Sequence, residues 1–393
     1  MIDFLISNER HHVAIMRPVV QALAAQGYPC RVVSLCEFRG VASPVEQFAG
    51  VDFRRVVNLR LRRSTTAGRQ TGGALAYWKR RLAHTVAWRL QLRGPVRRLW
   101  RAAPRLVVTA NDVAFPYNHY CSGLRARHIP FILLQEGVRF TLPAAGDMAY
   151  GQNGAACVAA WGASGADYFR RAGVPETRLA LTGTPQFDAV QPDAWAAPGA
   201  QLRGDLKLGR KVLLLLTNPI DDQGFCTTAE KMTLVRQFVE RLAPSFADGE
   251  FSLVIKLHGR EPVAGFRALL ADLPFAGRIV ITQSGPLYAL LALAQAAVVM
   301  TSTVGLEAMM FNLPLGVLEL PHGGFAGDYV SSGAARGLSV QSNDLVAQVA
   351  ALRQAPDDLQ TAARQYLAHN LATRHDAATR IVTLIKNYLE SKV

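Results

Sequence analysis

Short apolar runs alternate with longer amphipathic stretches along most of the chain. The apolar runs are rich in Val, Ile and Leu, and most of them end in small or polar residues. Continuous apolar runs of strand length are typical of parallel strands that are buried on both faces, whereas the stretches between them repeat with the period of a helix. The alternation therefore predicts βα units and parallel sheets.

The first half of the chain predicts one set of such units. An amphipathic helix at 13–26, closed by Gly27, connects the first two strands. The loop before this helix lacks the GxGxxG pattern, so a dinucleotide site is not supported. The expected strands are 2–6, 28–35, 106–109, 131–134, 158–161 and 179–182.

A second set of units follows residues 191–210, which are rich in Pro, Ala and Gly and show no convincing period, as expected of a linker. Within this set, Thr227 and Glu230 have the spacing of a capping box, which predicts a helix start. The expected strands are 211–216, 252–257, 278–282, 296–300 and 315–318. The predicted organisation is an N-terminal Rossmann-like domain, the linker, a C-terminal Rossmann-like domain and a C-terminal helix, at 1–190, 191–210, 211–370 and 371–393.

The composition agrees with two globular domains in a reducing compartment. The chain has 393 residues, of which 50% are hydrophobic and 18% are charged. Its five cysteines show no CxxC spacing, which argues against a zinc site or a disulfide framework. The amino terminus carries an early acid and a short apolar run, and the longest apolar stretch, 287–300, is too short to span a bilayer. We therefore expect a cytoplasmic protein.

The positive charge is concentrated in one segment. Of the net charge of +14, residues 53–111 contribute 15 Arg and Lys and no acid, so the rest of the chain carries 14 − 15 = −1. Trp78, Trp88 and Trp100 lie among these basic residues. Such a mixture suits an anionic membrane surface or a lipid-linked phosphate. The alternatives are a solvated helical face whose tryptophans are core and, least favoured, a nucleic-acid site.

The stretch 296–314 has the clearest candidate chemistry. An apolar strand turns into a helix of about ten residues, for which Ser302 or Thr303 suits the N-cap position. Gly305 leaves the first turn bare, so that a ligand could approach the backbone. Free amides at such a helix start bind anions, and we expect Glu307 to accept hydrogen bonds from sugar hydroxyls. The alternative is an ordinary capped helix with a solvated glutamate.

Other polar residues follow strands of the second domain. Lys256 and His258 are two apart, so they share a face of the strand end, and a pair of cations there suits a diphosphate. Thr217 and Asn218 follow the strand 211–216 and belong to the same predicted donor site.

In the first domain, candidate acids and bases follow three strands. Glu136 is the expected general base, because partial burial at the sheet edge would raise its pKa. Asp112 and His11 are the next candidates for that role. His11 and His12 lie in the first βα loop, where open α/β sheets place ligands; the alternative is a helix-capping histidine.

Two further groups complete the candidates. His322 and Asp328 bound a glycine-rich loop whose backbone could approach a ligand. Asp221 and Asp222 are adjacent and are interpreted as loop acids. Because no metal-ligand cluster is visible, the sequence predicts neither a metal site nor a cofactor.

Several of these motifs resemble those of GT-B enzymes. The first loop, 7–13 with Arg17, resembles the opening of nucleotide-sugar glycosyltransferases and of UDP-GlcNAc 2-epimerases. The turn 183–188 resembles the G-x-P-x-x-D turn of both groups. Residues 256–258 and 301–308 resemble the K-L-H-P and S-S/T-x-G-x-E-A motifs of capsule and lipopolysaccharide enzymes, namely polysialyltransferases, CDP-glycerol glycerophosphotransferases and Kdo transferases.

The resemblance implies a GT-B fold, with two Rossmann-like domains facing across a cleft, and roles for single residues. His258, Ser302 and Thr303 would hold the donor's phosphates, and Glu307 would meet the nucleotide ribose. The sequence departs from the pattern at Gly259, where proline is usual. It also lacks the paired acids of the epimerases, since only Glu307 is present. The residues left for the acceptor or for other parts of the cleft are His12, Arg17, His322 and Asp328.

The resemblance predicts a metal-independent glycosyltransferase of bacterial surface polysaccharide synthesis. It would transfer a sugar from a CMP-, CDP- or UDP-linked donor to a glycan or lipid-linked acceptor at the inner face of the membrane. The alternatives are a UDP-sugar 2-epimerase of the same fold and a non-catalytic protein that binds a nucleotide sugar or nucleic acid.

Overall fold

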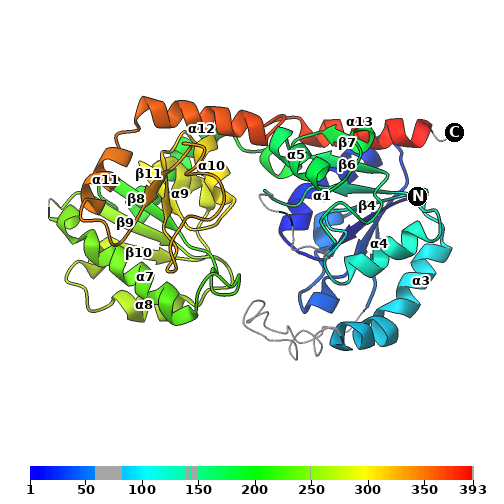
Figure 1. The fold of residues 1–393 in the computed structure, drawn as a ribbon, viewed down its shortest axis with the longest axis horizontal. Coiled ribbons are helices and arrows are strands. Elements are labelled where there is room, and N and C mark those ends of the chain that lie inside the picture. Colours follow the sequence, from blue (N-terminus) through cyan, green and yellow to red (C-terminus); the bar gives the residue numbers. More distant parts are fainter. Residues whose placement is uncertain (58–81, 139–141, 143–147, 248, 392–393) are drawn as a thin grey trace. The chain divides into compact units, whose positions relative to one another are not determined.

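The computed structural model describes residues 1–57, 82–138, 142, 148–247 and 249–391 (Figure 1). These residues form two compact units. Unit 1 contains the described residues up to Val190 together with those from Ala368 onward, and unit 2 contains Gln191–Leu367. Each unit is an α/β domain built on one parallel sheet, as the apolar runs predict.

Unit 1 has a seven-stranded parallel sheet in the order β3-β2-β1-β4-β5-β6-β7. Its strands are β1 (Ile2–Ile6), β2 (Cys30–Ser34), β3 (Asp52–Arg55), β4 (Leu106–Thr109), β5 (Phe131–Leu134), β6 (Cys157–Ala160) and β7 (Leu179–Leu181). Its helices include α1 (His11–Ala25), α3 (Arg93–Arg101), α4 (Tyr117–Arg125), α5 (Ala163–Arg171) and α13 (Ala377–Glu390), with the π-helical turn η3 (Trp88–Leu92) directly before α3. Short 3-10 turns are η1 (Glu37–Arg39), η2 (Val45–Phe48), η4 (Glu176–Arg178) and η5 (Pro185–Phe187).

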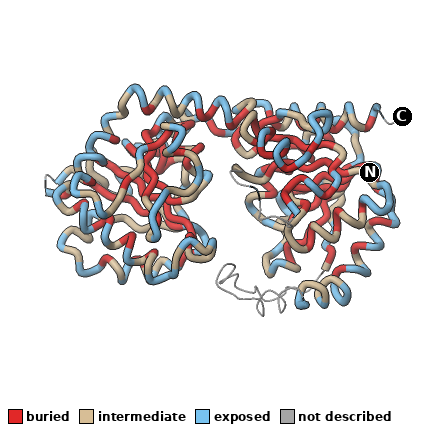
Figure 2. Tube along the Cα trace, in the orientation of Figure 1, coloured by how far each residue is buried: buried red, intermediate tan, exposed pale blue. Residues whose placement is uncertain are grey.

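The sheet of unit 1 is buried on both faces. Phe4 and Ile6 of β1 pack in one apolar cluster with side chains of α1 and α13. Leu5, which points to the opposite face, packs in a second cluster with α3, α4 and α5. The strands therefore lie between two helical layers, which explains why they are apolar at successive positions (Figure 2).

Unit 2 has a six-stranded parallel sheet in the order β10-β9-β8-β11-β12-β13. Its strands are β8 (Lys211–Leu216), β9 (Phe251–Lys256), β10 (Ile279–Thr282), β11 (Ala296–Val299), β12 (Leu315–Leu318) and β13 (Arg336–Leu338). Its helices are α6 (Ala196–Asp205), α7 (Thr228–Arg241), α8 (Val263–Leu270), α9 (Leu287–Leu293), α10 (Val304–Met310), α11 (Leu345–Leu352) and α12 (Asp357–Asn370), whose last residues belong to unit 1. Short 3-10 turns are η6 (Pro192–Trp195), η7 (Ala243–Phe246) and η8 (Ala276–Arg278).

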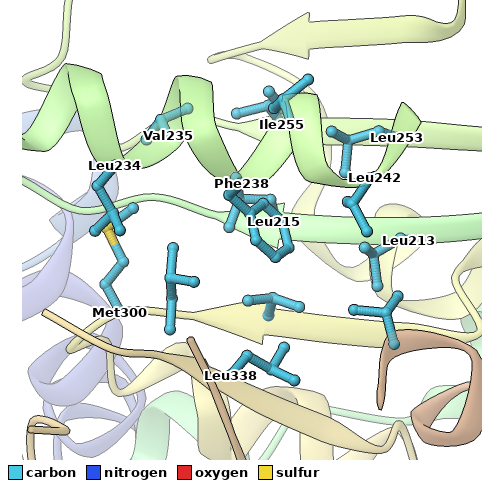
Figure 3. Packing of buried hydrophobic residues seen from close by; sticks show 14 of the residues in the cluster. Leu213, Leu215, Leu234, Val235, Phe238, Leu242, Leu253, Ile255, Met300 and Leu338 are labelled. Atoms are coloured by element: carbon cyan, nitrogen blue, oxygen red, sulfur yellow. The ribbon is translucent and has the colours of Figure 1, made fainter. Parts of the chain in front are cut away.

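The core of unit 2 forms around its central strands. Leu213 and Leu215 of β8 pack with Leu253 and Ile255 of β9 and with Phe238 of α7 (Figure 3). All five side chains are buried. This packing fixes the register of α7 on the sheet and leaves the polar strand ends at one edge.

The predicted capping box at the start of α7 is confirmed. The hydroxyl of Thr227 accepts a hydrogen bond from the amide of Glu230 at 3.2 Å, and the Glu230 carboxylate accepts one from the amide of Thr227 at 2.7 Å. Both bonds satisfy amides that the helix itself leaves free.

Two edge strands were not predicted. β3 has the sequence Asp-Phe-Arg-Arg and β13 has Arg-Gly-Leu. Each lies at the end of its sheet and pairs on one side only. These two sequences hold charged residues and a glycine in place of an apolar run, so a search for apolar runs misses them. The other two edge strands, β7 and β10, are apolar and were predicted.

The expectation of a linker without regular structure at 191–210 is wrong. Residues 196–205 form α6, which packs against α9. A Cβ added at Gly199 would lie 3.1 Å from the carbonyl oxygen of Ala289, so the glycine allows the two helices to approach closely. The alanine-rich sequence favours a helix, but its lack of a clear apolar stripe hid that helix from the periodicity.

The C-terminal segment packs on the rest of unit 1, and its contacts show what the residues of the 183–188 turn do. The Asp188 carboxylate accepts hydrogen bonds from the amides of Ala377 and Ala378 at 2.9 and 2.8 Å, and so caps α13. Gly183 has φ +75°, and a Cβ there would lie 2.7 Å from a methyl carbon of Thr373. The 183–188 turn thus holds α13 against the rest of unit 1.

Candidate functional site

The carboxyl ends of β1, β4 and β5 form a polar cluster in unit 1, because these strands are neighbours in the sheet. Glu136 lies at its centre. The carboxylate oxygens of Glu136 are 3.1 Å from His12 Nε2 and 2.9 Å from Asn111 Nδ2. His11 Nε2 lies 2.6 Å from the backbone carbonyl oxygen of Glu136. The structure therefore brings the predicted His11, His12 and Glu136 together and adds Asn111.

Hydrogen bonds determine the tautomer of His12. The backbone amide of Ser7 donates to Nδ1 of His12 at 3.1 Å, and the hydroxyl of Tyr117 lies 3.4 Å from the same nitrogen. Because Nδ1 accepts, Nε2 carries the proton and donates it to Glu136. His12 is buried, and its Nε2–H group points at the Glu136 carboxylate.

Hydrogen bonds also determine the orientation of the Asn111 side-chain amide. Its side-chain oxygen accepts hydrogen bonds from the amides of Val113 and Ala114, at 3.1 and 2.8 Å. The Nδ2 group is therefore the one that faces Glu136. Both side chains in contact with the Glu136 carboxylate are donors.

The predicted rise in the pKa of Glu136 is wrong. Burial alone would raise this pKa, but the hydrogen bond and electrostatic attraction of His12, the hydrogen bond from Asn111 and the attraction of His11 outweigh burial and lower it to about 2. The carboxylate is therefore ionised at neutral pH. Its side chain remains 28% exposed, so it is open to a further donor.

Asp112 does not fit the expected role of an alternative base. It is fully buried, and its carboxylate accepts hydrogen bonds from the amides of Gly151 and Asn153, both at 3.0 Å. The side-chain amide of Asn153 in turn donates to the backbone carbonyl of Asp112 at 2.8 Å. Asp112 therefore anchors the segment around 151–153, and its side chain is not exposed at the surface.

We expect Asp112→Ala to lower the free energy of unfolding by about 2–4 kcal/mol, because two buried amides lose their acceptor. Chemical denaturation would measure the change. Asp167→Ala is the matched control: this exposed acid pairs with Arg170 and should cost less than about 1 kcal/mol. Equal effects of the two substitutions would contradict the structural role of Asp112.

A second polar cluster lies in unit 2 at the carboxyl ends of β8, β9 and β11, which are also neighbours. Asn218 links two of these ends. Its side-chain oxygen accepts from the amide of Thr301 at 3.2 Å, and its Nδ2 group contacts the Thr301 hydroxyl. The predicted donor residues after these three strands therefore share one edge of the sheet.

The predicted helix after β11 is present but is shorter than the expected length of about ten residues. α10 contains seven residues, and Ser302 Oγ accepts a hydrogen bond from the amide of Val304 at 3.2 Å, while Thr303 is exposed. The expected role of Gly305 is wrong. Gly305 is buried, and a Cβ there would lie 2.9 Å from the ring of Tyr329, so the missing side chain makes room for this tyrosine rather than for a ligand.

Glu307 projects from α10 and is half-buried. The hydroxyl of Tyr288 donates to its carboxylate at 3.1 Å. Burial raises the pKa of Glu307 to about 7, although the bond from Tyr288 opposes the rise. The side chain therefore changes charge near neutral pH, in contrast to Glu136.

The two predicted cations after β9 differ in environment. The ammonium group of Lys256 donates to the carbonyl of Gln283 at 2.5 Å, and its side chain is half-buried. His258 is exposed, and its Nδ1 accepts from the amide of Arg260 at 3.2 Å. That bond leaves Nε2 as the nitrogen of His258 that can donate to a ligand.

Glu261 joins these predicted residues, although the sequence did not single it out. Its carboxylate accepts hydrogen bonds from the Thr217 hydroxyl at 2.6 Å and from the amide of His258 at 2.9 Å. Lys231 lies 3.2 Å from the same carboxylate and 2.7 Å from that of Asp221. Asp221, expected as a loop acid, is thus part of a largely buried ionic network that holds the ends of β8 and β9 together. No local pattern revealed this, because Glu261 and Lys231 are 30 residues apart.

We expect Glu261→Gln to weaken nucleotide binding about tenfold. One carboxylate oxygen accepts both hydrogen bonds, so the other oxygen, which faces Lys231, would become an amide NH2 group. Two donors would then face each other, and the network that anchors the His258 loop would lose its charge balance. Isothermal titration would measure the affinity. Glu240→Gln, which removes an exposed acid paired with Arg236, is the control and should leave affinity unchanged. Unchanged affinity in both variants would show that the network has no part in the site.

Three other predicted residues make contacts outside these clusters. Arg17 is exposed and donates to Gln47 at 2.6 Å. His322 lies 3.5 Å from Glu230 at the start of α7, and Asp328 accepts a hydrogen bond from Tyr366. Among the described residues, no group of three or more His, Cys, Asp or Glu side chains is placed to hold a metal ion.

Comparison with solved structures identifies the architecture. MnaA of Staphylococcus aureus, in a structure with UDP, superposes with a TM-score of 0.66 at 16% identity, over 99% of this chain and 96% of that one. UDP-GlcNAc 2-epimerase of Neisseria meningitidis, bound to UDP-GlcNAc, gives 0.64 at 14% identity, over 98% and 100%. The chain has the GT-B fold. A glycosyltransferase of Rickettsia africae gives 0.58 at 10% identity, over 100% and 99%.

At these identities the likeness shows the fold alone. No protein-family profile matches the sequence, and no curated protein matches it either. The resemblance of the motifs to GT-B enzymes is therefore supported at the level of the fold, whereas the individual capsule families named by those motifs are not.

Proposed function

We propose that this chain is a glycosyltransferase that uses a nucleotide-activated sugar as donor. The observation that carries the proposal is the Glu136 cluster, in which a carboxylate ionised at neutral pH lies at a sheet edge and is open to one more donor. In this proposal the cluster of unit 2 binds the nucleotide and phosphates of the donor, and Glu136 of unit 1 accepts the proton of the acceptor hydroxyl.

The proposed reaction is direct displacement. The acceptor oxygen forms a bond to the anomeric carbon of the sugar while the bond between that carbon and the phosphate oxygen breaks, and the nucleotide leaves with the electron pair. The hydroxyl becomes strongly acidic as its oxygen bonds to carbon, so even a carboxylate of low pKa can accept its proton late in the step. The Nε2–H of His12 keeps the carboxylate oriented throughout.

In unit 2, Lys256 at the end of β9 would meet the negative charge of the donor, and His258 would donate a hydrogen bond from Nε2. Burial and the neighbouring Arg260 lower the pKa of His258, so it contributes as a hydrogen-bond donor rather than as a cation. Ionised Glu307 would accept hydrogen bonds from the ribose hydroxyls. UDP and UDP-GlcNAc are present in the structures of MnaA and of the Neisseria enzyme, which supports a uridine nucleotide as the first donor to test.

A UDP-sugar 2-epimerase is the second candidate. It is favoured by the TM-scores, which are 0.66 and 0.64 for MnaA and the Neisseria epimerase and 0.58 for the Rickettsia glycosyltransferase. Two features of this chain oppose it. The paired acids of the epimerase motif are replaced by Glu307 alone, and the burial of Asp112 leaves Glu136 as the accessible carboxylate of its cluster.

Incubation with radiolabelled UDP-sugar, with and without a glycan or polyprenyl-linked acceptor, tests the proposal. A transferase converts label into a larger product only when the acceptor is added. Epimerised UDP-sugar without acceptor would establish the second candidate. Saturable binding of UDP-sugar with no product from any acceptor would indicate a non-catalytic protein that binds a nucleotide sugar.

A further inference from the structure

One surface of unit 1 is not explained by either polar cluster. Residues 82–87, η3 and α3 form a continuous helical segment, 82–101, which we call the arginine helix. It belongs to the basic segment that the sequence singled out. Among the described residues, no helix has the length and hydropathy required to cross a bilayer.

The inner face of the arginine helix is anchored by aromatic residues. Trp88 stacks on His119, with ring centroids 4.8 Å apart, and Trp100 is buried against Tyr120. A Cβ added at Gly123 of α4 would lie 2.2 Å from the ring of Trp100, so only glycine fits beneath it. Trp88 and Trp100 therefore pack against unit 1, as the alternative of core tryptophans predicts, and Trp78 lies outside the described residues.

The outer face presents apolar residues instead. Leu82, Val86 and Leu90 are 65%, 47% and 79% exposed and lie four residues apart. Residues with this spacing form one row along a helix. An exposed row of three aliphatic side chains is unusual for a protein surface and indicates contact with an apolar partner.

Arginines continue the same face toward the end of the helix. Arg93, Arg97 and Arg101 are exposed and four residues apart, and Arg89 and Arg98 flank them. Among the described residues, none of these arginines takes part in an ion pair, and the sequence contains no acid between 53 and 111. The face is therefore aliphatic in its first half and strongly cationic in its second half.

We propose that this face binds the surface of an anionic phospholipid bilayer. The aliphatic row enters the boundary between headgroups and acyl chains, and the arginines bind lipid phosphates. Nucleic acid fits the face less well, because its bases stack on exposed aromatic side chains, and the tryptophans here point into the core. The inference rests on the arginine helix alone and does not depend on the proposed transferase activity.

Flotation of the full-length protein with vesicles tests the proposal. We expect binding to vesicles of phosphatidylcholine with about 30% phosphatidylglycerol, a fraction chosen to give a surface potential in the physiological range. Binding to pure phosphatidylcholine should be at least tenfold weaker. Raising the salt to 1 M should release most of the protein, because the Debye length falls to about 3 Å.

Two triple variants separate the two halves of the face. Arg93→Gln with Arg97→Gln and Arg101→Gln should reduce the affinity for anionic vesicles about a hundredfold. Leu82→Ser with Val86→Ser and Leu90→Ser should reduce it at least tenfold while leaving the salt dependence in place. All six residues are exposed, so thermal unfolding should be unchanged.

A charge-matched variant supplies the control. Lys207→Gln with Arg267→Gln and Arg374→Gln removes three exposed charges elsewhere and should retain vesicle binding. The proposal is overturned if wild-type protein ignores anionic vesicles, if the control loses as much affinity as the arginine variant, or if binding is equal on neutral vesicles. Salt-sensitive binding to RNA, DNA or an acidic protein that these vesicles do not compete away would overturn it as well.

Discussion

Replacing Glu136 with Gln is expected to lower turnover by about 10²–10⁴-fold while donor binding persists, because the proton acceptor is lost and the shape is kept. Steady-state kinetics with added acceptor would measure the loss, and titration with donor would measure binding. Glu46→Gln, an exposed acid of η2, is the control and should retain full turnover. Near-normal turnover of the Glu136 variant would show that the base lies elsewhere.

The Glu136 variant also needs a stability measurement. His12 and Asn111 both donate to the carboxylate, and an amide can accept from only one of them without placing two donors face to face. The pKa of Glu136 is lowered from 4.5 to about 2 in the folded protein, so its ionised form contributes stability above pH 4.5 that is lost as the pH falls toward 2. In Glu136→Gln this acid-dependent loss should be absent.

Donor binding is expected to tighten about tenfold between pH 6 and pH 8. With a pKa of about 7, Glu307 is roughly one-tenth ionised at pH 6 and nine-tenths ionised at pH 8, and only the ionised form accepts two ribose hydroxyls. Isothermal titration should use an intact UDP-sugar, whose diphosphate has no terminal group titrating near pH 6. Constant affinity across this range would contradict the assigned role of Glu307.

Glu307→Gln is the matched variant. It should flatten the pH dependence and bind at about the level of wild type at pH 6. The raised pKa of Glu307 makes folding stability depend on pH in the opposite direction to donor binding. Burial favours the neutral acid, so Glu307 contributes its full stability below pH 4.5, and this stability is lost as the pH rises through 7. Wild type should therefore lose stability over this window relative to Glu307→Gln.

The fold was predictable where burial and local sequence agree. Strands such as β1 and β8 lie between two helical layers, so nearly all of their residues are apolar and identify them. The strands β3 and β13 and the alanine-rich α6 were missed, because these two strands contain no apolar run and a helix without a distinct apolar stripe leaves no periodic signal. Tertiary contacts, and not local pattern, establish these elements.

The candidate site was predictable in position but not in chemistry. Polar residues that follow neighbouring parallel strands must meet at one edge, so Glu136 and His12 were brought together as expected. The charge of Glu136 depends on partners far along the chain, because His12 and Asn111 reverse the expected shift of its pKa. The amides of Gly151 and Asn153, which bind Asp112, belong to a segment whose proximity to β4 only the fold reveals.

Gly305, Trp88 and Trp100 show the same limit of prediction from sequence. Gly305 has the sequence context of a phosphate-binding turn, yet its hydrogen atom faces the ring of Tyr329. Trp88 and Trp100 lie among basic residues in the sequence, which suits either a membrane surface or a core, and the structure places them as the inner anchors of the arginine helix. In both cases spacing places a residue on a helix but does not say which side is covered.

The fate of the hydrogen at C2 of the donor sugar tests the central claim most directly. UDP-sugar would be incubated with the protein and acceptor in D2O, and the recovered donor and product would be examined by mass spectrometry and NMR. Direct displacement predicts one nucleotide released for each sugar transferred, with no deuterium at C2 in donor or product. Deuterium at C2 of UDP-sugar recovered without acceptor would contradict the account, because it requires removal of that proton and therefore an epimerase.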